Sequence, residues 1–133
     1  GILAAIVVPQ FTNASNEAVK GAIQSQLQTI SSQMELYRVR NQGAYPTLGD
    51  GEENNGWGEL VGESYLKEEP FNGYTGTSAI VVGGEAAALA GTRDSASGWN
   101  YDATTYEVFA TGYDATNNAL AHEDTFEGAE EEE

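Results

Sequence analysis

The chain has 133 residues, of which 40% are hydrophobic, and its 21 Asp and Glu residues against 5 Lys and Arg give a formal net charge of -16. This length predicts one domain of ordinary size. Such an acidic surface repels nucleic-acid phosphates and anionic membrane surfaces, so charge excludes nucleic acid as a partner. The sequence has no cysteine, which excludes disulfides and thiolate metal sites.

The first 40 residues predict one long helix. After Pro9 no proline or cluster of helix breakers occurs before Gly43, and apolar residues recur in steps of three and four. This apolar stripe consists of Val19, Ile23, Leu27, Ile30, Met34 and Tyr37. The polar back of the helix is predicted to consist of Lys20, Gln24, Gln28, Ser31, Glu35 and Arg38. A left-handed cap at Gly43 and the ring of Pro46 predict the end of the helix.

The start of this helix, residues 2–8, is apolar on every side. A helix end of this kind requires burial in protein or lipid, and seven residues are too few to span a bilayer, which needs roughly 20. It is either a buried core helix or a surface that packs against copies of itself. We favour the second interpretation, because a separate amphipathic stripe follows the segment. Pro9 removes one amide hydrogen and predicts a bend or local unwinding of the helix.

Gly1-Ile-Leu-Ala-Ala-Ile-Val-Val-Pro-Gln-Phe11 resembles the second half of the N-terminal signature of type IV pilins and of the pseudopilins of type II secretion. In that family a phenylalanine-initiated apolar run with one glutamate lies upstream, and the sequence here lacks this first part of the helix. Asn41-Gln-Gly-Ala-Tyr-Pro-Thr47 is similar to the family's helix exit. Residues 62–74 and 106–114 resemble its Tyr-Leu segment and its last strand with the following loop.

The resemblance implies a pilin fold: a polymerisation helix over residues 1–40 and a globular acidic head over residues 41–133 with a flexible acidic tail. It implies a structural subunit of an extracellular filament on the cell surface, whose partners are its own copies in a helical filament. Other implied partners are the inner membrane before assembly, a prepilin peptidase, and a pilus or secretion assembly machinery. The implied filament interface consists of Ile2, Leu3, Ile6, Val7, Pro9 and Phe11.

The sequence of the head predicts a small β-sheet. Residues 79–82 form a short β-branched run, and residues 98–102 and 105–110 form two aromatic and β-branched runs joined by a tight connection. Trp99 and Tyr101 share one face by period two, as do Tyr106, Val108 and Ala110. The predicted fold is therefore α+β, with the long helix packed on an antiparallel sheet of about three strands. A short helix is expected near residues 58–65, and residues 83–97 are expected to form a surface excursion.

The loop after the last predicted strand is rich in oxygen ligands. Asp114, Asn117, Asn118, Glu123 and Asp124 offer the carboxylate and amide oxygens that calcium prefers. Their spacing matches no EF-hand, and such loops also occur without a metal. The resemblance adds that major pseudopilins bind calcium in this loop, with aspartates that Asp114 and Asp124 match. The expected calcium ligands are Asp114, Asn117 and Asp124.

Enzyme motifs are absent from the sequence. His122 is its one histidine and is expected to be solvated in the acidic loop. No glycine-rich phosphate loop precedes a helix, and no helix carries a metal-binding pair. The favoured function is structural, with two alternatives left open. One is the major pseudopilin of a type II secretion system, which is calcium-stabilised, lies in the periplasm and is anchored in the inner membrane. The other is a soluble metal- or ligand-binding module.

Overall fold

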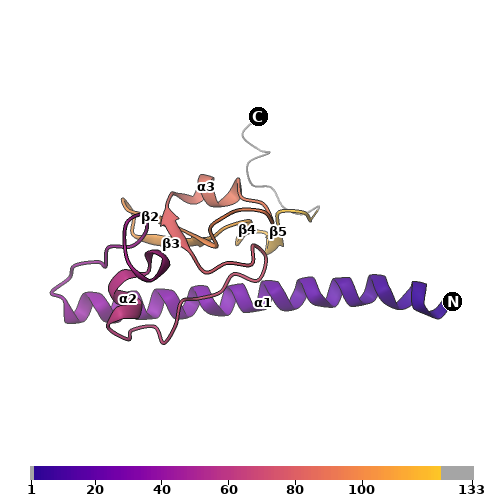
Figure 1. The fold of residues 1–133 in the computed structure, drawn as a ribbon, viewed down its shortest axis with the longest axis horizontal. Helices are drawn as coiled ribbons and strands as arrows, with labels where there is room; N and C mark the ends of the chain where they lie inside the picture. The colour runs from indigo at the N-terminus through magenta and orange to yellow at the C-terminus, as the bar shows by residue number, and fades with distance from the viewer. Residues whose placement is uncertain (1, 124–133) are drawn as a thin grey trace.

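Helix α1, which spans Ile2–Arg40, is the element on which the rest of the structure lies. The computed structural model describes the backbone of residues 2–123 and the side chains of residues 16–123. The helix runs through Pro9 without a break, so the predicted unwinding is wrong for the isolated chain. A proline removes only one amide hydrogen, and the turns on both sides remain helical. The N-terminal end of α1 extends beyond the head (Figure 1).

Helix α1 ends in a left-handed turn, as the sequence predicts. Gln42 and Gly43 have φ values of 61° and 91°. The N–H of Gly43 donates to the carbonyl of Arg38 at 2.8 Å, which is the bond of a Schellman cap. Arg38 and Arg40 lie in the last turn, where cations interact favourably with the helix dipole. The structure differs from the expectation in one detail: Gln42 as well as Gly43 occupies the left-handed region.

Two short helices follow α1. The 3-10 helix η1 spans Asn54–Gly56, and α2 spans Gly58–Gly62, which confirms a short helix in the predicted place. Helix α2 lies against α1 near its C-terminal end (Figure 1). The hydroxyl of Tyr37 on α1 donates to the carboxylate of Glu59 on α2 at 2.5 Å. This bond joins the two helices where the chain reverses direction.

The main sheet has three strands in the order β1-β2-β3, namely Ile80–Val82, Trp99–Asp102 and Glu107–Ala110. Strands β2 and β3 are antiparallel, as predicted, but β1 runs parallel to β2. The sheet is therefore mixed, and the prediction of an antiparallel sheet is wrong. The reason is the segment between β1 and β2, which contains helix α3 (Glu85–Leu89) and carries the chain back across the sheet. The α+β class and the three strands are confirmed.

The sheet lies between α1 on one face and α3 on the other (Figure 1). Trp99 pairs with Ala110 and Tyr101 with Val108, so these four side chains share the face toward α1. Tyr106 lies outside β3 and is 42% exposed, so its predicted place on this face is wrong. The predicted helix stripe is confirmed as part of the core, which joins Ile23, Ile30, Met34, Tyr37, Leu48, Trp57, Leu60, Leu66, Ile80, Trp99, Tyr101 and Leu120.

The two tryptophans are fully buried, and each has its polar group satisfied. Their rings meet edge to face with centroids 6.2 Å apart. The indole N–H of Trp57 donates to the carbonyl of Ser78 at 2.7 Å, and that of Trp99 donates to the carbonyl of Pro70 at 2.9 Å. Burial of such large apolar groups therefore leaves no orphaned donor on either ring.

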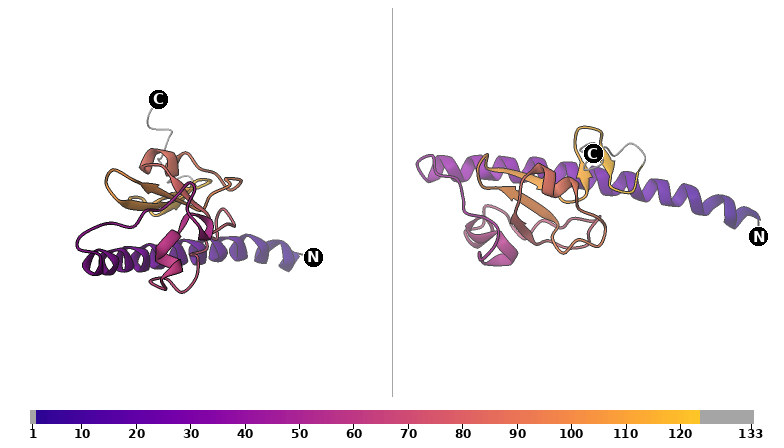
Figure 2. Two further views of the ribbon diagram at one scale, coloured as in Figure 1. Left: turned by 60° about the vertical axis from the view of Figure 1, so that its left-hand side comes forward. Right: turned by 90° about the horizontal axis from the view of Figure 1, so that it is seen from above.

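A second, two-stranded sheet closes the described chain. Strands β4 (Tyr113–Asp114) and β5 (Ala119–Leu120) pair antiparallel and lie beside α1 (Figure 2). Beyond β5, the Glu123 carboxylate accepts from the ammonium of Lys20 on α1 at 3.1 Å and from the N–H of Leu120 at 2.9 Å. We call the contact between Lys20 and Glu123 the clasp.

The prediction that Lys20 lies on the polar back of α1 is wrong, because Lys20 takes part in the clasp. Lys20 is only 7% exposed, because the segment after β5 covers it. Its hydrogen bond to Glu123 raises the pKa of Lys20 above its ordinary value of 10.5. Burial alone would raise the pKa of Glu123, but the Leu120 N–H and the Lys20 ammonium outweigh burial and lower it. Each partner is therefore held in its charged form.

We expect Glu123→Gln to lower the free energy of unfolding by about 1–2 kcal/mol, because the mutation leaves Lys20 covered, with Glu17 as its remaining ion partner among the described residues. The wild-type contribution of Glu123 is present above its ordinary pKa of 4.5 and is lost as the pH falls through the lowered value. Urea unfolding at several pH values measures both effects. Glu35→Gln, in the exposed pair with Arg38, is the control and should change stability by less than about 0.5 kcal/mol.

Tyr37 and Tyr101 should ionise later than exposed tyrosines during an alkaline titration. The bond to Glu59 raises the pKa of Tyr37 from 10.0 to about 12, and burial raises that of Tyr101 to about 12. Because the folded state favours the neutral ring, this stabilisation is present below pH 10.0 and is lost as the pH rises through about 12. Tyrosinate absorbance measures the titration, and Tyr37→Phe should remove one late-titrating ring. A single transition at the ordinary pKa for all seven tyrosines would contradict the packing.

Candidate functional site

Helix α1 has a second face, opposite the one that the head covers. At about 100° per residue, positions 18, 22, 25, 29, 32, 36 and 39 lie on the far side of the helix from the core stripe. All seven side chains are exposed, including two large apolar ones, Leu36 at 38% and Val39 at 78%. We call this set the outer stripe: Ala18, Ala22, Ser25, Thr29, Ser32, Leu36 and Val39.

The outer stripe is uncharged, and its seven residues follow one another at alternating steps of four and three. This is the spacing at which one helix packs along another. Small side chains such as those of Ala22 and Ser25 let two helices approach closely. Sequence analysis missed the stripe, because it defined the back of the helix by its large polar residues. The regular spacing of small residues was the available signal.

The N-terminal end of α1 projects past the head as a bare helix (Figures 1 and 2). The predicted interface residues Ile2, Leu3, Ile6, Val7, Pro9 and Phe11 lie in this end, where only the backbone is described and is helical. Their side-chain contacts lie outside the described part of the chain. In the sequence, the spacing of the outer stripe continues upstream through Ala4, Val7, Phe11 and Ala14.

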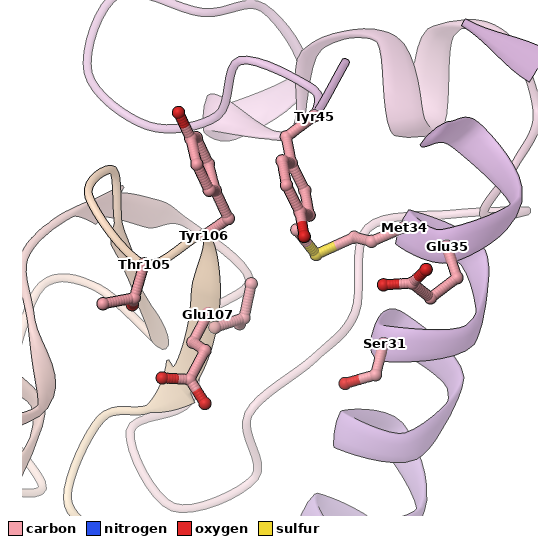
Figure 3. Close-up of a pocket in the computed structure, with 8 residues that line it drawn as sticks. Ser31, Met34, Glu35, Tyr45, Thr105, Tyr106 and Glu107 are labelled. Atoms are coloured by element: carbon pink, nitrogen blue, oxygen red, sulfur yellow. The ribbon is translucent and has the colours of Figure 1, made fainter. Parts of the chain in front are cut away.

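An acidic and aromatic cleft lies between α1 and the turn that leads into β3 (Figure 3). Its volume is about 220 Å³. The rings of Tyr45 and Tyr106 stack with centroids 4.2 Å apart and planes 4° from parallel. Glu107 lies on one wall, and Ser31 and Glu35 on the other (Figure 3). The cleft joins residues far apart in the chain, so no local pattern indicated it.

Local hydrogen bonds shape the turn at one wall of this cleft. The Asp102 carboxylate accepts from the N–H groups of Thr104 and Thr105 at 2.8 and 3.2 Å, and these bonds lower the pKa of Asp102. Tyr106 has a φ of 66°, and its N–H donates to the carbonyl of Asp102 at 2.6 Å. The guanidinium of Arg38 lies 4.4 Å from the centroid of the Tyr45 ring and binds Glu35 at 3.2 Å. These contacts hold the tyrosine stack at the mouth of the cleft.

The polar groups of the cleft are the carboxylates of Glu35 and Glu107 with neighbouring hydroxyls. Carboxylates next to tyrosine rings suit a cationic group. His122 lies elsewhere: it is exposed, as expected, and its ring stacks on Tyr74 with centroids 5.6 Å apart.

The predicted calcium loop is only partly described. Asp114 lies in β4, and its carboxylate accepts from the N–H groups of Thr116 and Asn117 at 3.0 and 3.3 Å. The side-chain amide of Asn117 donates to the same carboxylate at 2.8 Å. The structure thus brings Asp114 and Asn117 together, whereas Asp124 lies outside the described residues. Within residues 16–123, no three acidic or histidine side chains converge as a metal-binding group.

Comparison with protein-family models, curated proteins and solved structures gave no match. Among the helices described, none has the length and apolar character needed to cross a membrane.

If the loop after β4 binds calcium, as its composition predicts, millimolar calcium should raise the melting temperature and a chelator should lower it. Binding to the folded state alone contributes roughly 2.7 kcal/mol at a hundredfold excess over Kd. Asp124→Ala should abolish the response. Asp50→Ala, which removes an exposed carboxylate from another loop, should leave it intact. An equal shift with magnesium or with monovalent salt at matched ionic strength would show general screening of the -16 charge and contradict the site.

Proposed function

We propose that this protein is the structural subunit of a type IV pilin-like extracellular filament and that its fold is the pilin fold. Helix α1 packs against α1 helices of other copies in a helical polymer, and the acidic head lies on the outside. The observation that carries the proposal is the uncharged outer stripe of α1, exposed along the whole length of the head. A helix that is covered on one side only and bare at its end has surface available for its own copies.

The apolar start of α1 supplies much of the driving force for assembly. Residues 2–8 are all aliphatic, and a bare helix would expose them to water. Burial of apolar surface contributes about 25 cal/mol per Å², so this segment alone gives several kcal/mol per subunit. The outer stripe then extends the same contact down the helix. Its small side chains let neighbouring helices approach without burying charge.

The charge distribution agrees with a head that faces water. The net charge of -16 keeps the heads soluble. The carboxylates of Glu17 and Glu35 flank the outer stripe without interrupting it. Lys20 is used inside the subunit by the clasp, so it does not serve as a cation for neighbouring subunits.

Two alternatives have specific support. A calcium-stabilised major pseudopilin is supported by the juxtaposition of Asp114 and Asn117. A soluble ligand-binding module is supported by the acidic cleft, whose tyrosines and carboxylates suit a cation. In the favoured proposal the subunit is not an enzyme. It first lies in the inner membrane, is a substrate of a prepilin peptidase, and is then added by an assembly machinery to the filament on the cell surface. Native cells and a deletion strain distinguish the three proposals. Surface fibres indicate the filament subunit, a secretion defect on deletion without visible fibres indicates the pseudopilin, and neither observation indicates the soluble module.

Thr29→Glu should abolish or strongly reduce filament assembly, because it places a charge in the middle of the outer stripe. Thr104→Glu makes the same substitution at an exposed position of the turn between β2 and β3, outside α1, and should assemble normally. The double variant Ile6→Ser, Val7→Ser should also fail to assemble. Electron microscopy measures the filaments, and the melting temperature of each variant shows that the head remains folded. Normal filaments from Thr29→Glu would contradict packing through the outer stripe.

A further inference from the structure

The head carries an exposed apolar side chain on a rigid support. Phe71 is 54% exposed and lies in the segment between α2 and β1. Its two neighbours are buried. The carbonyl of Pro70 accepts from the indole of Trp99 at 2.9 Å. The phenyl ring is therefore presented to solvent by backbone that is held in place.

Asn72 holds the other side of Phe71. Its side-chain amide donates to the carbonyls of Gly98 and Thr111 at 2.7 and 3.1 Å. Its carboxamide oxygen accepts from the N–H groups of Tyr74 and Thr75 at 2.8 and 3.2 Å. Asn72 is 0% exposed, so these bonds are made without competition from water. An aromatic ring that is ordered before binding loses little conformational entropy when it is buried, which is the property of a binding hot spot.

A hollow of matching apolar character lies elsewhere on the head. It has a volume of about 180 Å³ and is bounded by α1, α3 and β3. Its lining is mainly apolar and includes Leu27, Ala88, Leu89, Val108 and Phe109. Glu85 is the charged residue of the lining, and both Glu85 and Ala115 of the lining are exposed. The hollow accepts one large apolar side chain.

The charges beside the two features are complementary. Lys67 lies four residues before Phe71, is exposed, and makes no ion pair within the described residues. Glu85 at the hollow is also exposed and is likewise without an ion pair in that part of the chain. In a chain with only 5 Lys and Arg, an exposed lysine four residues before an exposed phenylalanine suits a carboxylate of another copy.

The two features belong to different surfaces of the head. Asn72, next to Phe71, is bonded to Gly98 and Thr111 at the ends of β2 and β3, whereas the hollow is bounded by α1, α3 and β3 and its lining includes no residue of this segment. A contact between different surfaces of identical copies is heterologous and repeats in one direction. If the rotation between copies does not close a ring, the contact produces an open helical array.

We propose that Phe71 of one subunit inserts into the hollow between α1, α3 and β3 of the next subunit, with Lys67 of the first paired to Glu85 of the second. This head-to-head contact rests on the proposed function, because it operates between subunits that α1 has already brought together. It adds directionality to the filament, since each subunit donates one phenylalanine and receives one. The second copy is the occupant that both the size and the charge of the hollow favour.

Cysteine pairs test the contact, since the chain has no cysteine of its own. In filaments of the full chain, Glu68→Cys with Ala115→Cys keeps the Phe71 ring and should give an oxidised ladder of monomer, dimer, trimer and longer species on a non-reducing gel. Either single variant should give no species beyond a dimer. The matched control is Val82→Cys with Ala115→Cys, because Val82 is an exposed residue of β1 that takes no part in the proposed contact. A control ladder as strong as that of the test pair would overturn the proposal.

Charge reversal gives a second, independent measurement. Lys67→Glu should weaken the head contact and reduce the ladder about tenfold, and Lys67→Glu combined with Glu85→Lys should restore it. Phe71→Ser should raise the concentration needed for assembly about tenfold or more. If the unmodified chain forms filaments but the test pair gives only monomers, the head contact is wrong and the polymer remains. If the unmodified chain forms no filaments, the proposed function itself fails.

Discussion

Burial of one helix stripe is the constraint on which the rest of the structure depends. A head of about 90 residues buries a limited core of its own, and this chain has no cysteine to cross-link it. Ile23 and Ile30 of α1 are each 1% exposed, and they complete the core that the tryptophans and the strands begin. The core of the head is therefore built on α1, and the head in turn covers this side of the helix.

Polar contacts then hold each segment that the core alone would leave loose. The clasp fastens the segment after β5 to α1, and Tyr37 fastens α2. Asn72 ties the loop before β1 to the ends of β2 and β3. Each contact is buried or half-buried and has its donors and acceptors matched, so it adds specificity without an unpaired group. Ion pairs and amides do in this chain what cross-links do in many small secreted domains.

The same helix provides two surfaces with different chemistry. The core stripe carries large aliphatic and aromatic side chains, whereas the outer stripe carries alanine, serine and threonine until Leu36 and Val39 near its end. A side that meets a sheet needs bulk to fill the space between layers, and a side that meets another helix needs close approach. In the proposed filament, this division lets one element form the core of each subunit and the axis of the polymer, while the heads contact one another at their edges.

Local patterns in the sequence determined the long helix, its core stripe, its end near Gly43 and the positions of the three main strands. These features depend on periodicity and turn residues, which are properties of neighbouring positions. The apolar start of α1 was also evident from composition alone. Tertiary structure decided the parallel direction of β1, the burial of Lys20, the stacking of Tyr45 on Tyr106 and the hollow at β3. Each of these depends on which distant segments meet, because a strand's direction and a side chain's burial are set by its partner across the fold.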